Sequence, residues 1–408
     1  MSVISEERKL PSTWRWVRCQ DVVDVRDGTH DTPTKTNFGI PLITSKNLTP
    51  QGIDFSNITY ISEEDHQSIE KRSAVDDGDV LFAMIGTIGN PVIVEKDRRF
   101  SIKNVALFKL NKSLYYPPFF KELLNTSIIR KQLARNTKGG NQKFVSLSVL
   151  RNLVIPLPPL EEQKRIAEIL DRAEELRSKR REAIAQLDTL TQAIFLEMFG
   201  DPVTNLKGWK RLPFAQLLTN IDSGWSPVCL DRPVYGEEWG VLKLGAVTWC
   251  EYNPTENKAL PLGVEPNPAL EVKTGDLLFT RKNTYELVGA CAIVRETPPR
   301  LLMPDLIFRF RLRADAAVNP YFLHQLLIYP TKRRNIQKLA GGSASSMPNI
   351  SKAKLQTTLI EVPPLNLQQE FADRVEAVEK LKAAHRASLS ELDALFGSLQ
   401  HRAFRGEL

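Results

Sequence analysis

The side chains that could carry out catalysis are scattered along this 408-residue chain rather than grouped. Its five histidines, from His30 to His401, show no metal-ligand spacing. The GxxxxGK[ST] phosphate loop, the GxGxxG dinucleotide loop and the GxSxG nucleophile turn are all absent. The four cysteines form no CxxC pair, which argues against a zinc site or a disulfide framework. The sequence therefore predicts a protein with no catalytic centre and no metal of its own.

Two tetrapeptides resemble the Asn/Asp-Pro-Pro-Tyr/Phe motif with which DNA amino-methyltransferases bind a flipped base. They are NPYF at residues 319–322 and YPPF at residues 116–119. The first lacks the second proline, the second begins with a residue that has neither a carboxyl nor an amide group, and no glycine-rich cofactor loop accompanies either. Because they occupy equivalent positions in the two halves of the chain, we expect them to begin helices.

Polar loops remain as candidates for binding. Glycine lets a backbone approach a phosphate closely, and Lys, Arg and Asn can make paired hydrogen bonds with base edges. Any one such loop is by default only a turn, but both halves of the chain carry several. The candidate DNA-binding residues are Thr29, His30, Thr44, Ser45, Lys46, Asn47, Asn141, Gln142, Lys143, Ser223, Trp225, Ser226, Arg281, Lys282, Asn283, Ser343, Ser345 and Ser346.

The distribution of charge supports nucleic acid as the ligand. The net charge is +7 and the pI about 9.1. Residues 1–157 carry 22 basic against 17 acidic side chains, and residues 200–362 carry 20 against 15, so each block has a net charge of +5. The segments 158–199 and 363–408 have net charges of −2 and −1. Two basic blocks thus alternate with two nearly neutral segments, which indicates where a polyanion would bind.

This alternation is also an internal repeat, and such a repeat fixes the architecture. PPLEEQKRIAEILDRAEEL at residues 158–176 aligns with PPLNLQQEFADRVEAVEKL at residues 363–381, 205 residues further on. Looser matches precede it, including GDVLF at residues 78–82 with GDLLF at residues 275–279. The chain therefore consists of a block, a helix, a second block and a second helix.

Each repeated tail is predicted to be a long amphipathic helix, because two prolines precede a run of good helix formers. Apolar residues recur at steps of four and three, as in a coiled coil, with Arg180 as a charged interruption. In the second copy Phe371 and Val375 can take over the stripe where Arg374 departs from it. The predicted inter-helix packing residues are Ile169, Ala173, Leu176, Leu187, Leu190, Ile194, Val378, Leu381, Leu392, Leu395 and Leu399.

The predicted fold class is mixed α/β (α+β), with two globular domains and a pair of long antiparallel coiled-coil helices related by a pseudo-twofold repeat. The expected domains are residues 1–157, the helical segment 158–200, residues 201–362 and the helical segment 363–408. The β-rich runs lie at residues 80–85, 92–94, 277–279, 290–294 and 306–312. Helical spacing with a basic end is expected over 118–133 and 320–339, where the charges belong either to a solvated face or to a phosphate contact.

This arrangement resembles the specificity subunit of type I restriction-modification systems along essentially the whole chain. The resemblance rests on IPLPPLEEQKRIAEIL (155–170), VPPLNLQQEF (362–371), the GDVLF and GDLLF strings, and the terminal FRGEL (404–408). It implies that each variable block is a target recognition domain that reads one half of a bipartite DNA site. It also implies that the repeated helices space the two halves and dock two methyltransferase subunits. The second tail departs from the first at residues 366–369, NLQQ in place of EEQK, which puts equal docking in doubt.

The resemblance further implies that catalysis lies in partner chains. The methyltransferase subunits would use S-adenosylmethionine, and the restriction and translocase subunits, attached through the methyltransferase, would use ATP and Mg²⁺. We expect a cytoplasmic protein with no membrane association, because no apolar run approaches the length of a membrane span. Two other readings remain open: a coiled-coil scaffold that binds protein or peptide, and a self-contained methyltransferase or nuclease.

Overall fold

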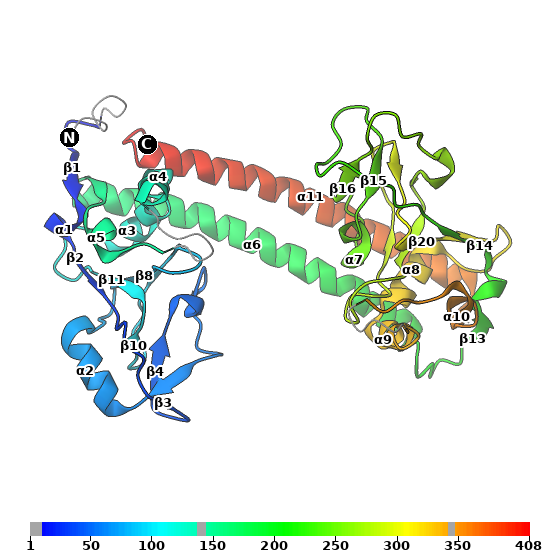
Figure 1. Ribbon diagram of the computed structural model, residues 1–408, viewed down its shortest axis with the longest axis horizontal. Coiled ribbons are helices and arrows are strands. Elements are labelled where there is room, and N and C mark those ends of the chain that lie inside the picture. The colour runs from blue at the N-terminus through cyan, green and yellow to red at the C-terminus, as the bar shows by residue number, and fades with distance from the viewer. Residues whose placement is uncertain (1–9, 137–143, 342–346) are drawn as a thin grey trace. The chain divides into compact units, whose positions relative to one another are not determined.

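The computed structural model describes residues 10–136, 144–341 and 347–408 and divides into two compact units. Unit 1 comprises residues 1–181 and 387–408, and unit 2 comprises residues 182–386. Each unit combines sheets and short helices with parts of two long helices, so the predicted mixed α/β class is confirmed (Figure 1). No helix in the three described ranges is both long and apolar enough to cross a membrane.

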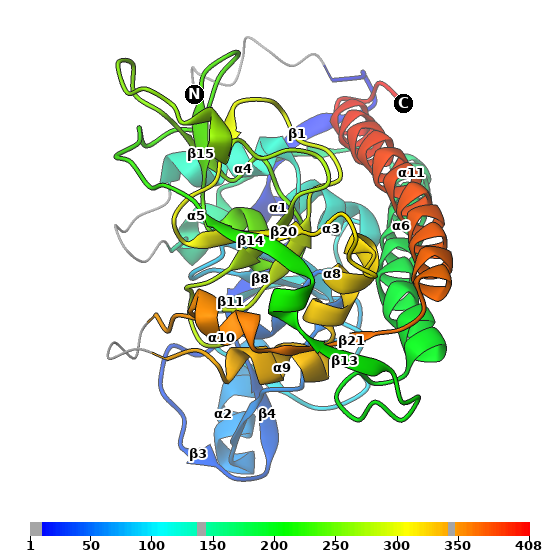
Figure 2. The same ribbon diagram turned by 90° about the vertical axis from the view of Figure 1, so that its right-hand side faces the viewer.

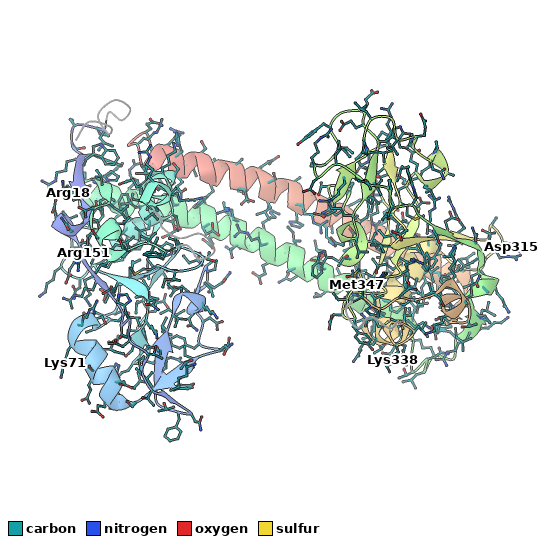
Figure 3. All side chains as sticks on the ribbon, in the orientation of Figure 1. Arg18, Lys71, Arg151, Asp315, Lys338 and Met347 are labelled. Carbon is teal, nitrogen blue, oxygen red and sulfur yellow. The ribbon has the colours of Figure 1, made fainter. Side chains whose placement is uncertain are left out.

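Unit 1 is built on two four-stranded sheets, ordered β2-β11-β8-β9 and β10-β4-β7-β3. The first is antiparallel, whereas β10 and β4 of the second run parallel. The strands are β1 (Arg15–Arg18), β2 (Asp24–Asp27), β3 (Lys35–Thr36), β4 (Ile40–Ile43), β5 (Leu48–Thr49), β6 (Gly52–Ile53), β7 (Thr59–Ile61), β8 (Val80–Ala83), β9 (Gly89–Ile93), β10 (Ser101–Ile102), β11 (Val105–Lys109) and β12 (Val154–Leu157). The helices are α1 (Cys19–Val22), α2 (Glu63–Ser73), α3 (Pro117–Leu124), α4 (Ser127–Asn136) and α5 (Leu147–Arg151). Arg151 fixes α5 to β2 by donating to the carbonyl of Val25 at 2.8 and 3.0 Å (Figure 3).

Unit 2 repeats this plan with a four-stranded antiparallel sheet, β14-β20-β17-β18, and a three-stranded sheet, β16-β15-β19. In the smaller sheet β15 and β19 again run parallel. The strands are β13 (Lys210–Pro213), β14 (Leu218–Ser223), β15 (Gly240–Leu242), β16 (Asn257–Ala259), β17 (Leu277–Thr280), β18 (Cys291–Ile293), β19 (Leu301–Leu302), β20 (Ile307–Leu312) and β21 (Leu359–Val362). The helices are α7 (Gly245–Thr248), α8 (Pro320–Ile328), α9 (Pro330–Gln337) and α10 (Lys352–Gln356).

The repeated Gly-Asp strings have the same structural role in both units. Gly78 and Gly275 have φ angles of 77° and 91°, which glycine adopts without a steric penalty, and they turn the chain into β8 and β17. The aspartate that follows is buried and holds a cation from the neighbouring strand. Asp79 accepts from Lys109 at 2.6 Å, and Asp276 accepts from Arg309 at 3.0 Å. A second carboxylate shares each cation, Asp76 for Lys109 at 2.6 Å and Asp222 for Arg309 at 3.0 Å.

The two long helices are α6 (Leu160–Phe199) and α11 (Leu365–Ala403). A buried glutamine ties the first turn of each helix to the globular part of the unit in which the helix begins. Gln163 donates to the carbonyls of Leu114 and Pro158, both at 3.0 Å, and accepts from the backbone N–H of Tyr116 at 2.8 Å. Gln368 donates to Ala317 and Pro363 at 3.1 and 2.7 Å and accepts from the N–H of Asn319 at 2.8 Å. The direction of each helix is thus set by three hydrogen bonds from one side chain.

The helices pair in antiparallel fashion within each unit, and they lie side by side in both views (Figure 2). In unit 1, Nε of Arg177 lies 2.7 Å from Oδ1 of Asp393, and its guanidinium also pairs with Glu174. In unit 2, Nζ of Lys382 lies 2.7 Å from Asp188 and 3.2 Å from Glu379. These residues are equivalent in the internal repeat, so a matching cluster of ion pairs joins the two helices in each unit.

Aromatic residues pack the C-terminal end of each long helix against a short helix. Phe199, at the end of α6, packs against Phe322 of α8 with a centroid separation of 4.7 Å. Phe404, directly after α11, packs against Phe119 of α3 at 5.0 Å. Each long helix therefore begins in one unit and ends in the core of the other.

Four of the predicted inter-helix packing residues prove to be exposed, which corrects that prediction. Leu176, Leu190, Leu381 and Leu395 are 41% to 54% exposed. Ala173 and Val378 are buried, as are Phe371 and Val375, and the other predicted positions are partly buried. The prediction failed because the seam runs through Arg177 and Lys382, whose long aliphatic stems pack between the helices while their charged ends are paired.

Two further sequence expectations can be scored against this fold. All five β-rich runs coincide with strands, namely β8, β9, β17, β18 and β20. The helical stretches 118–133 and 320–339 are each broken into two helices, by a Thr126 side-chain cap in unit 1 and by Pro330 in unit 2. The two tetrapeptides begin α3 and α8, as expected, and Asn319 caps α8 by accepting from Tyr321 N–H at 2.8 Å.

Replacing the buried glutamine tests whether it anchors the helix. Gln163→Leu leaves one backbone N–H and two carbonyls without partners in the interior, so we expect a loss of about 2 to 3 kcal/mol in the free energy of unfolding. Gln67→Leu, on the exposed face of α2, is the matched control and should change it by less than about 0.5 kcal/mol. Urea denaturation of the full chain measures both, and equal stability of the two variants would contradict the anchoring role.

Candidate nucleic-acid interface

In unit 1 the structure brings two of the predicted polar loops together. Loop 28–31 follows β2 and loop 44–47 follows β4, and both contact Asn104 at the end of β10. Nδ1 of His30 lies 2.9 Å from Oδ1 of Asn104, and Oγ of Ser45 donates to the Asn104 carbonyl at 3.3 Å. Asn104 has a φ of 55°, a left-handed conformation that asparagine tolerates. It therefore joins the two loops into one polar surface.

A close backbone approach explains the glycine in the first loop. A Cβ on Gly28 would lie 2.2 Å from the carbonyl oxygen of Ile102, so no larger residue fits. This approach allows the N–H of Thr29 to donate to that same carbonyl at 3.0 Å. The result is that Thr29 and His30 leave the sheet beside Lys103 and Asn104.

The neighbours of His30 in this cluster shift its pKa. Its hydrogen bonds to Asn104 and to Asp27, the latter at 2.8 Å from Nε2, raise the pKa of His30 above its usual value of 6.5. Arg72 shares Asp27 and opposes this shift. His30 thus keeps its positive charge at a higher pH than an isolated histidine.

The second loop borders a cavity of about 790 Å³. Lys46 is exposed there, and Thr44 and Ser45 are partly exposed. Asn47, in contrast, is buried, and its amide donates to the carbonyls of Asp54 and Asn57 at 3.1 and 3.3 Å, so it shapes the loop. The cavity is lined by Leu42, Thr44, Ser45, Lys46, Asn47, Asp54, Asn57, Thr59, Ile85, Gly86, Thr87, Lys103 and Asn104.

Unit 2 has an equivalent surface made of different side chains. A Cβ on Gly224 would lie 2.1 Å from the carbonyl oxygen of Met303, as Gly28 approaches Ile102 in unit 1. The N–H of Trp225 donates to Met303 at 2.9 Å. Ser226 then hydrogen-bonds to the carboxylate of Asp305, and its Oγ accepts from the Asp305 N–H at 3.0 Å. Ser226 and Asp305 thus stand where His30 and Asn104 stand in unit 1.

The other predicted residues differ in their burial and contacts. Asn283 is buried and donates to Oγ1 of Thr248 at 3.2 Å, so it fixes α7. Arg281 and Lys282 are partly buried, and Arg281 lies over the ring of Phe308 at 5.3 Å. Ser223 is exposed at the end of β14. Asn141, Gln142, Lys143, Ser343, Ser345 and Ser346 lie outside the described residues.

One cation of the second basic run is paired within the fold. Lys332 is buried, and its Nζ lies 2.5 Å from Glu361 and donates to the carbonyl of Leu359. Burial lowers the pKa of Lys332 although Glu361 opposes the shift. Lys332 therefore has a structural role in place of a phosphate contact.

Sequence reasoning missed Lys103, Asn104 and Asp305. Each follows a short strand, β10 or β19, that pairs in parallel with β4 or β15 and so ends beside the loop after that strand. The equivalent of loop 44–47 in unit 2 is therefore the segment after β15, with exposed Lys243, which was also missed. The only local signal was an Asn or Asp shortly after a short predicted strand in each half.

These surfaces can form hydrogen bonds with base edges and phosphates and contact them with positive charge. Among the described residues no group of three His, Cys, Asp or Glu side chains could hold a metal ion. The cysteines there are unpaired thiols, and burial raises the pKa of Cys19 to about 12, which makes it a poor nucleophile.

Comparisons with known proteins give the family. The model of the type I restriction modification DNA specificity domain matches residues 11–186 and 243–394. The specificity subunit of the type I restriction enzyme EcoEI from Escherichia coli is 33% identical over 46% of this chain and 33% of its own length. The EcoKI specificity subunit from E. coli K12 is 23% identical over 98% of this chain and 90% of its own length.

Solved structures share the fold. A type I restriction-modification S subunit from M. genitalium superposes with a TM-score of 0.56 at 14% identity, over 97% of this chain and 98% of that one. A chain from a structure that describes complex assembly and conformational transition of the type I R-M system gives a TM-score of 0.59 at 21% identity, over 98% of this chain and all of that one. With the family domain matched in both halves, this chain belongs to the type I restriction-modification specificity subunits, a non-catalytic family with two recognition domains.

Proposed function

We propose that this chain binds a bipartite, asymmetric double-stranded DNA site, with one half-site on each unit, and thereby directs a type I restriction-modification complex. The observation that carries this proposal is the repeated loop in which Gly28 and Gly224 approach a strand end. Both loops present polar side chains, and both recognition blocks have a net charge of +5. One scaffold used twice suits a ligand with two similar but unequal halves.

The two halves of the site differ because the readers differ. Unit 1 presents His30, paired with Asn104, and unit 2 presents Ser226, paired with Asp305. An amide can both donate to and accept from an adenine edge, whereas a carboxylate accepts only, as from the amino group of cytosine. The recognised sequence is therefore asymmetric even though the backbone of the chain is repeated.

Exposed leucines recur at equivalent positions of the two long helices, and each could contact a protein partner. In unit 1 they are Leu160, Leu176 and Leu395, and in unit 2 they are the repeat-equivalent Leu365, Leu381 and Leu190. Exposed leucines that recur on both helices outside the seam indicate docking surfaces rather than chance exposure. We infer that two methyltransferase subunits dock here, one on each set.

The remaining partners follow from this assembly. Restriction and translocase subunits would join through the methyltransferase subunits. S-adenosylmethionine, ATP and Mg²⁺ would then be bound by those partner chains, and this chain would select the DNA sequence that the complex binds.

DNA affinity should depend on the charge of His30. Because the pKa of His30 is raised above 6.5, the imidazolium is the main form at pH 6 and is lost as the pH rises through the raised value. We expect the affinity of the wild-type chain for DNA to fall by a few-fold more than that of His30→Gln between pH 6 and 8.5, at constant salt. Fluorescence anisotropy measures both, and parallel pH profiles would contradict a role for this charge.

The two readers should be separable by mutation. Asn104→Ala should relax or lose specificity in one half of the methylated site, and Asp305→Ala in the other half only, because each side chain belongs to one unit. Each altered contact should change discrimination at its base pair by about 1 to 3 kcal/mol. Mapping of methylated adenines in cells that carry each variant gives the result. Changes in the same half for both variants would contradict one half-site per unit.

The two sets of exposed leucines should determine how many methyltransferase subunits the chain binds. Leu381→Glu places a charge in the proposed interface of unit 2 and should weaken that methyltransferase copy by at least about tenfold. Leu176→Glu should do the same in unit 1, and the double variant should bind neither copy. The control is Leu262→Glu, on a fully exposed residue outside the long helices. Native mass spectrometry counts the bound copies, and two copies on the double variant would exclude these surfaces.

A further inference from the structure

Three cations of unit 2 lie where β17 ends and α10 begins. Arg281 and Lys282 directly follow β17, and Lys352 is the first residue of α10. The guanidinium carbon of Arg281 lies 5.3 Å from the centre of the Phe308 ring, and Nζ of Lys352 lies 5.5 Å from the same centre. Lys282 forms a β-bridge with Asn349, close in sequence to Lys352. The fold therefore brings the three residues into one cation cluster.

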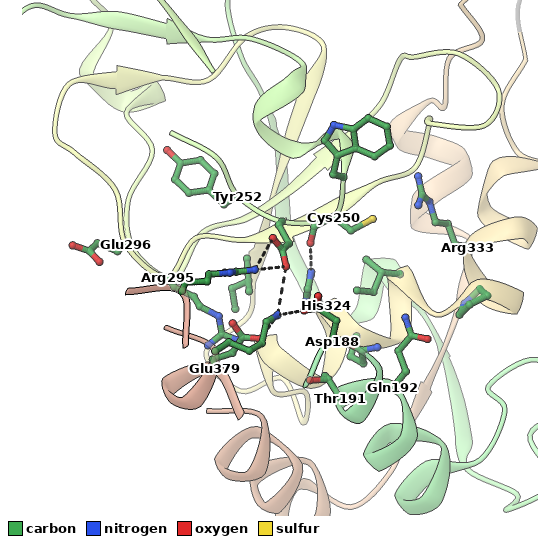
Figure 4. A pocket seen from close by; sticks show the side chains of 18 of the residues that line it. Asp188, Thr191, Gln192, Cys250, Tyr252, Arg295, Glu296, His324, Arg333 and Glu379 are labelled. Carbon is green, nitrogen blue, oxygen red and sulfur yellow. Dashed lines mark hydrogen bonds and ion pairs between the residues drawn. The ribbon is translucent and has the colours of Figure 1, made fainter. Parts of the chain in front are cut away.

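The cation cluster has no carboxylate partner. None of its three members forms an ion pair with an acidic side chain of the described residues. Several other cations of unit 2 are neutralised within the fold. In a cavity of about 740 Å³, Lys382 pairs with Asp188 at 2.7 Å (Figure 4). In the same cavity Arg386 pairs with Glu251 at 3.4 Å. The positive charge of the cation cluster, in contrast, is available to an anion from outside the chain.

The cation cluster is adjacent to the polar surface around Asp305. The backbone N–H of Arg281 donates to the carbonyl of Leu306 at 3.0 Å, and Leu306 directly follows Asp305. The carbonyl of Arg281 accepts from the N–H of Ile350 at 2.8 Å. An anion bound by the cluster would therefore lie beside the carboxylate that is proposed to contact a base.

The internal repeat identifies the counterparts of the cluster in unit 1. The same two backbone contacts recur there, since the N–H of Val145 donates to the carbonyl of Met84 at 2.9 Å and Ile85 forms a β-bridge with Phe144. A serine caps the short helix that follows in both units. Unit 1 thus has uncharged side chains where unit 2 has cations. The counterparts are Met84, Ile85 and Leu147 in place of Arg281, Lys282 and Lys352.

The counterpart of Lys282 shows which surface this position faces. Ile85 lines the cavity of about 790 Å³ that Ser45 and Asn104 also line. Because the strand pairing and the bridges match in the two units, Lys282 faces the corresponding surface of unit 2. That surface contains Asp305, so the lysine and the carboxylate border the same ligand.

The exposure of the three cations differs, which separates their roles. Lys282 and Lys352 are partly exposed, whereas Nε of Arg281 is buried. A lysine ammonium binds phosphate as a compact point charge. The two lysines can therefore contact an anion directly, and Arg281 adds to the positive potential around them.

The anion that suits this cluster is a DNA phosphate. Phosphates flank every base that a protein contacts, and phosphate contacts fix the position of the protein on the duplex without selecting a sequence. Each phosphate that a lysine neutralises releases counterions condensed on DNA, so such contacts make the affinity depend steeply on salt. The cluster can therefore be recognised by its contribution to that salt dependence.

We propose that Lys282 and Lys352 bind phosphates of the DNA backbone next to the half-site of unit 2, and that unit 1 makes no such contact at Ile85 and Leu147. The proposal rests on the proposed binding of DNA by this chain. It assigns a sequence-independent contact to one unit only. The two units thus contribute unequally to the salt dependence of binding, although their frameworks are repeats of each other.

Exchange of the lysines for the unit 1 residues tests the proposal. The variant Lys282→Ile with Lys352→Leu introduces the side chains that the repeat carries at these positions, so we expect it to fold. The matched control is Lys210→Ile with Lys273→Leu, which removes two exposed cations, on β13 and before β17. Fluorescence anisotropy measures DNA affinity from about 0.1 to 0.5 M salt on the full chain assembled with methyltransferase subunits. The probes are a duplex with the mapped methylation motif and a duplex without it.

We expect the slope of log affinity against log salt to become shallower by about 2 in the lysine variant and to stay unchanged in the control. The affinity for both duplexes should fall by the same factor, at least about tenfold at about 0.1 M salt, because a phosphate contact carries no sequence information.

Three results have other meanings. An unchanged slope in the lysine variant overturns the proposal and leaves the lysines a role in the fold alone, while DNA binding stands. A loss confined to the duplex with the motif also overturns it, because the lysines would then contact bases. Absence of salt-dependent binding by the wild-type complex would overturn the proposed DNA binding itself.

Neutral substitutions in the DNA locate the contact. A single methylphosphonate removes the negative charge of one phosphate at a chosen position of the duplex. Positions that weaken binding of the wild-type complex but not of the lysine variant should lie next to the half-site that Asp305→Ala alters. Such positions next to the other half-site would contradict the assignment to unit 2.

Discussion

Two buried glutamine side chains set the geometry on which this molecule depends. Gln163 and Gln368 each satisfy one N–H and two carbonyls at the point where a long helix leaves its recognition domain. A buried amide with all its partners in place has one favourable orientation, so the helix axis is fixed relative to the domain. The charged clusters around Arg177 and Lys382 then hold the two helices together in antiparallel pairs, and aromatic residues seat their ends.

Under the proposed function, the repeated framework lets one chain carry two unequal DNA-reading surfaces. Backbone features recur, such as the close approach of Gly28 and Gly224 and the Gly-Asp turns before β8 and β17. The side chains on this framework differ, since His30 and Asn104 in unit 1 give way to Ser226 and Asp305 in unit 2. Because the framework bears the stability, the exposed side chains can change with little effect on folding. This separation suits a protein whose task is to specify a sequence.

The sequence predicted the features that are local and periodic. The repeat, the two long helices and five strands follow from spacing alone, and the resemblance in the helical tails indicated the family. The helix seam was misplaced because apolar residues were counted and the stems of Arg177 and Lys382 were not. Asn104 and Asp305 were missed because they reach the loops that begin at Gly28 and Gly224 through long-range pairing. That pairing is the parallel alignment of β10 with β4 and of β19 with β15. Asn47 and Asn283 were predicted to contact DNA, yet both are buried and their side-chain amides form hydrogen bonds within the fold.

The central claim is that this chain alone selects the DNA site for the partner subunits. The most direct measurement is a genome-wide map of methylated adenines in cells with and without this chain, with the methyltransferase gene intact. The account predicts that a split motif, two short specified halves around a fixed spacer, is methylated with the chain and unmethylated without it. The same methylation pattern in both strains would contradict it.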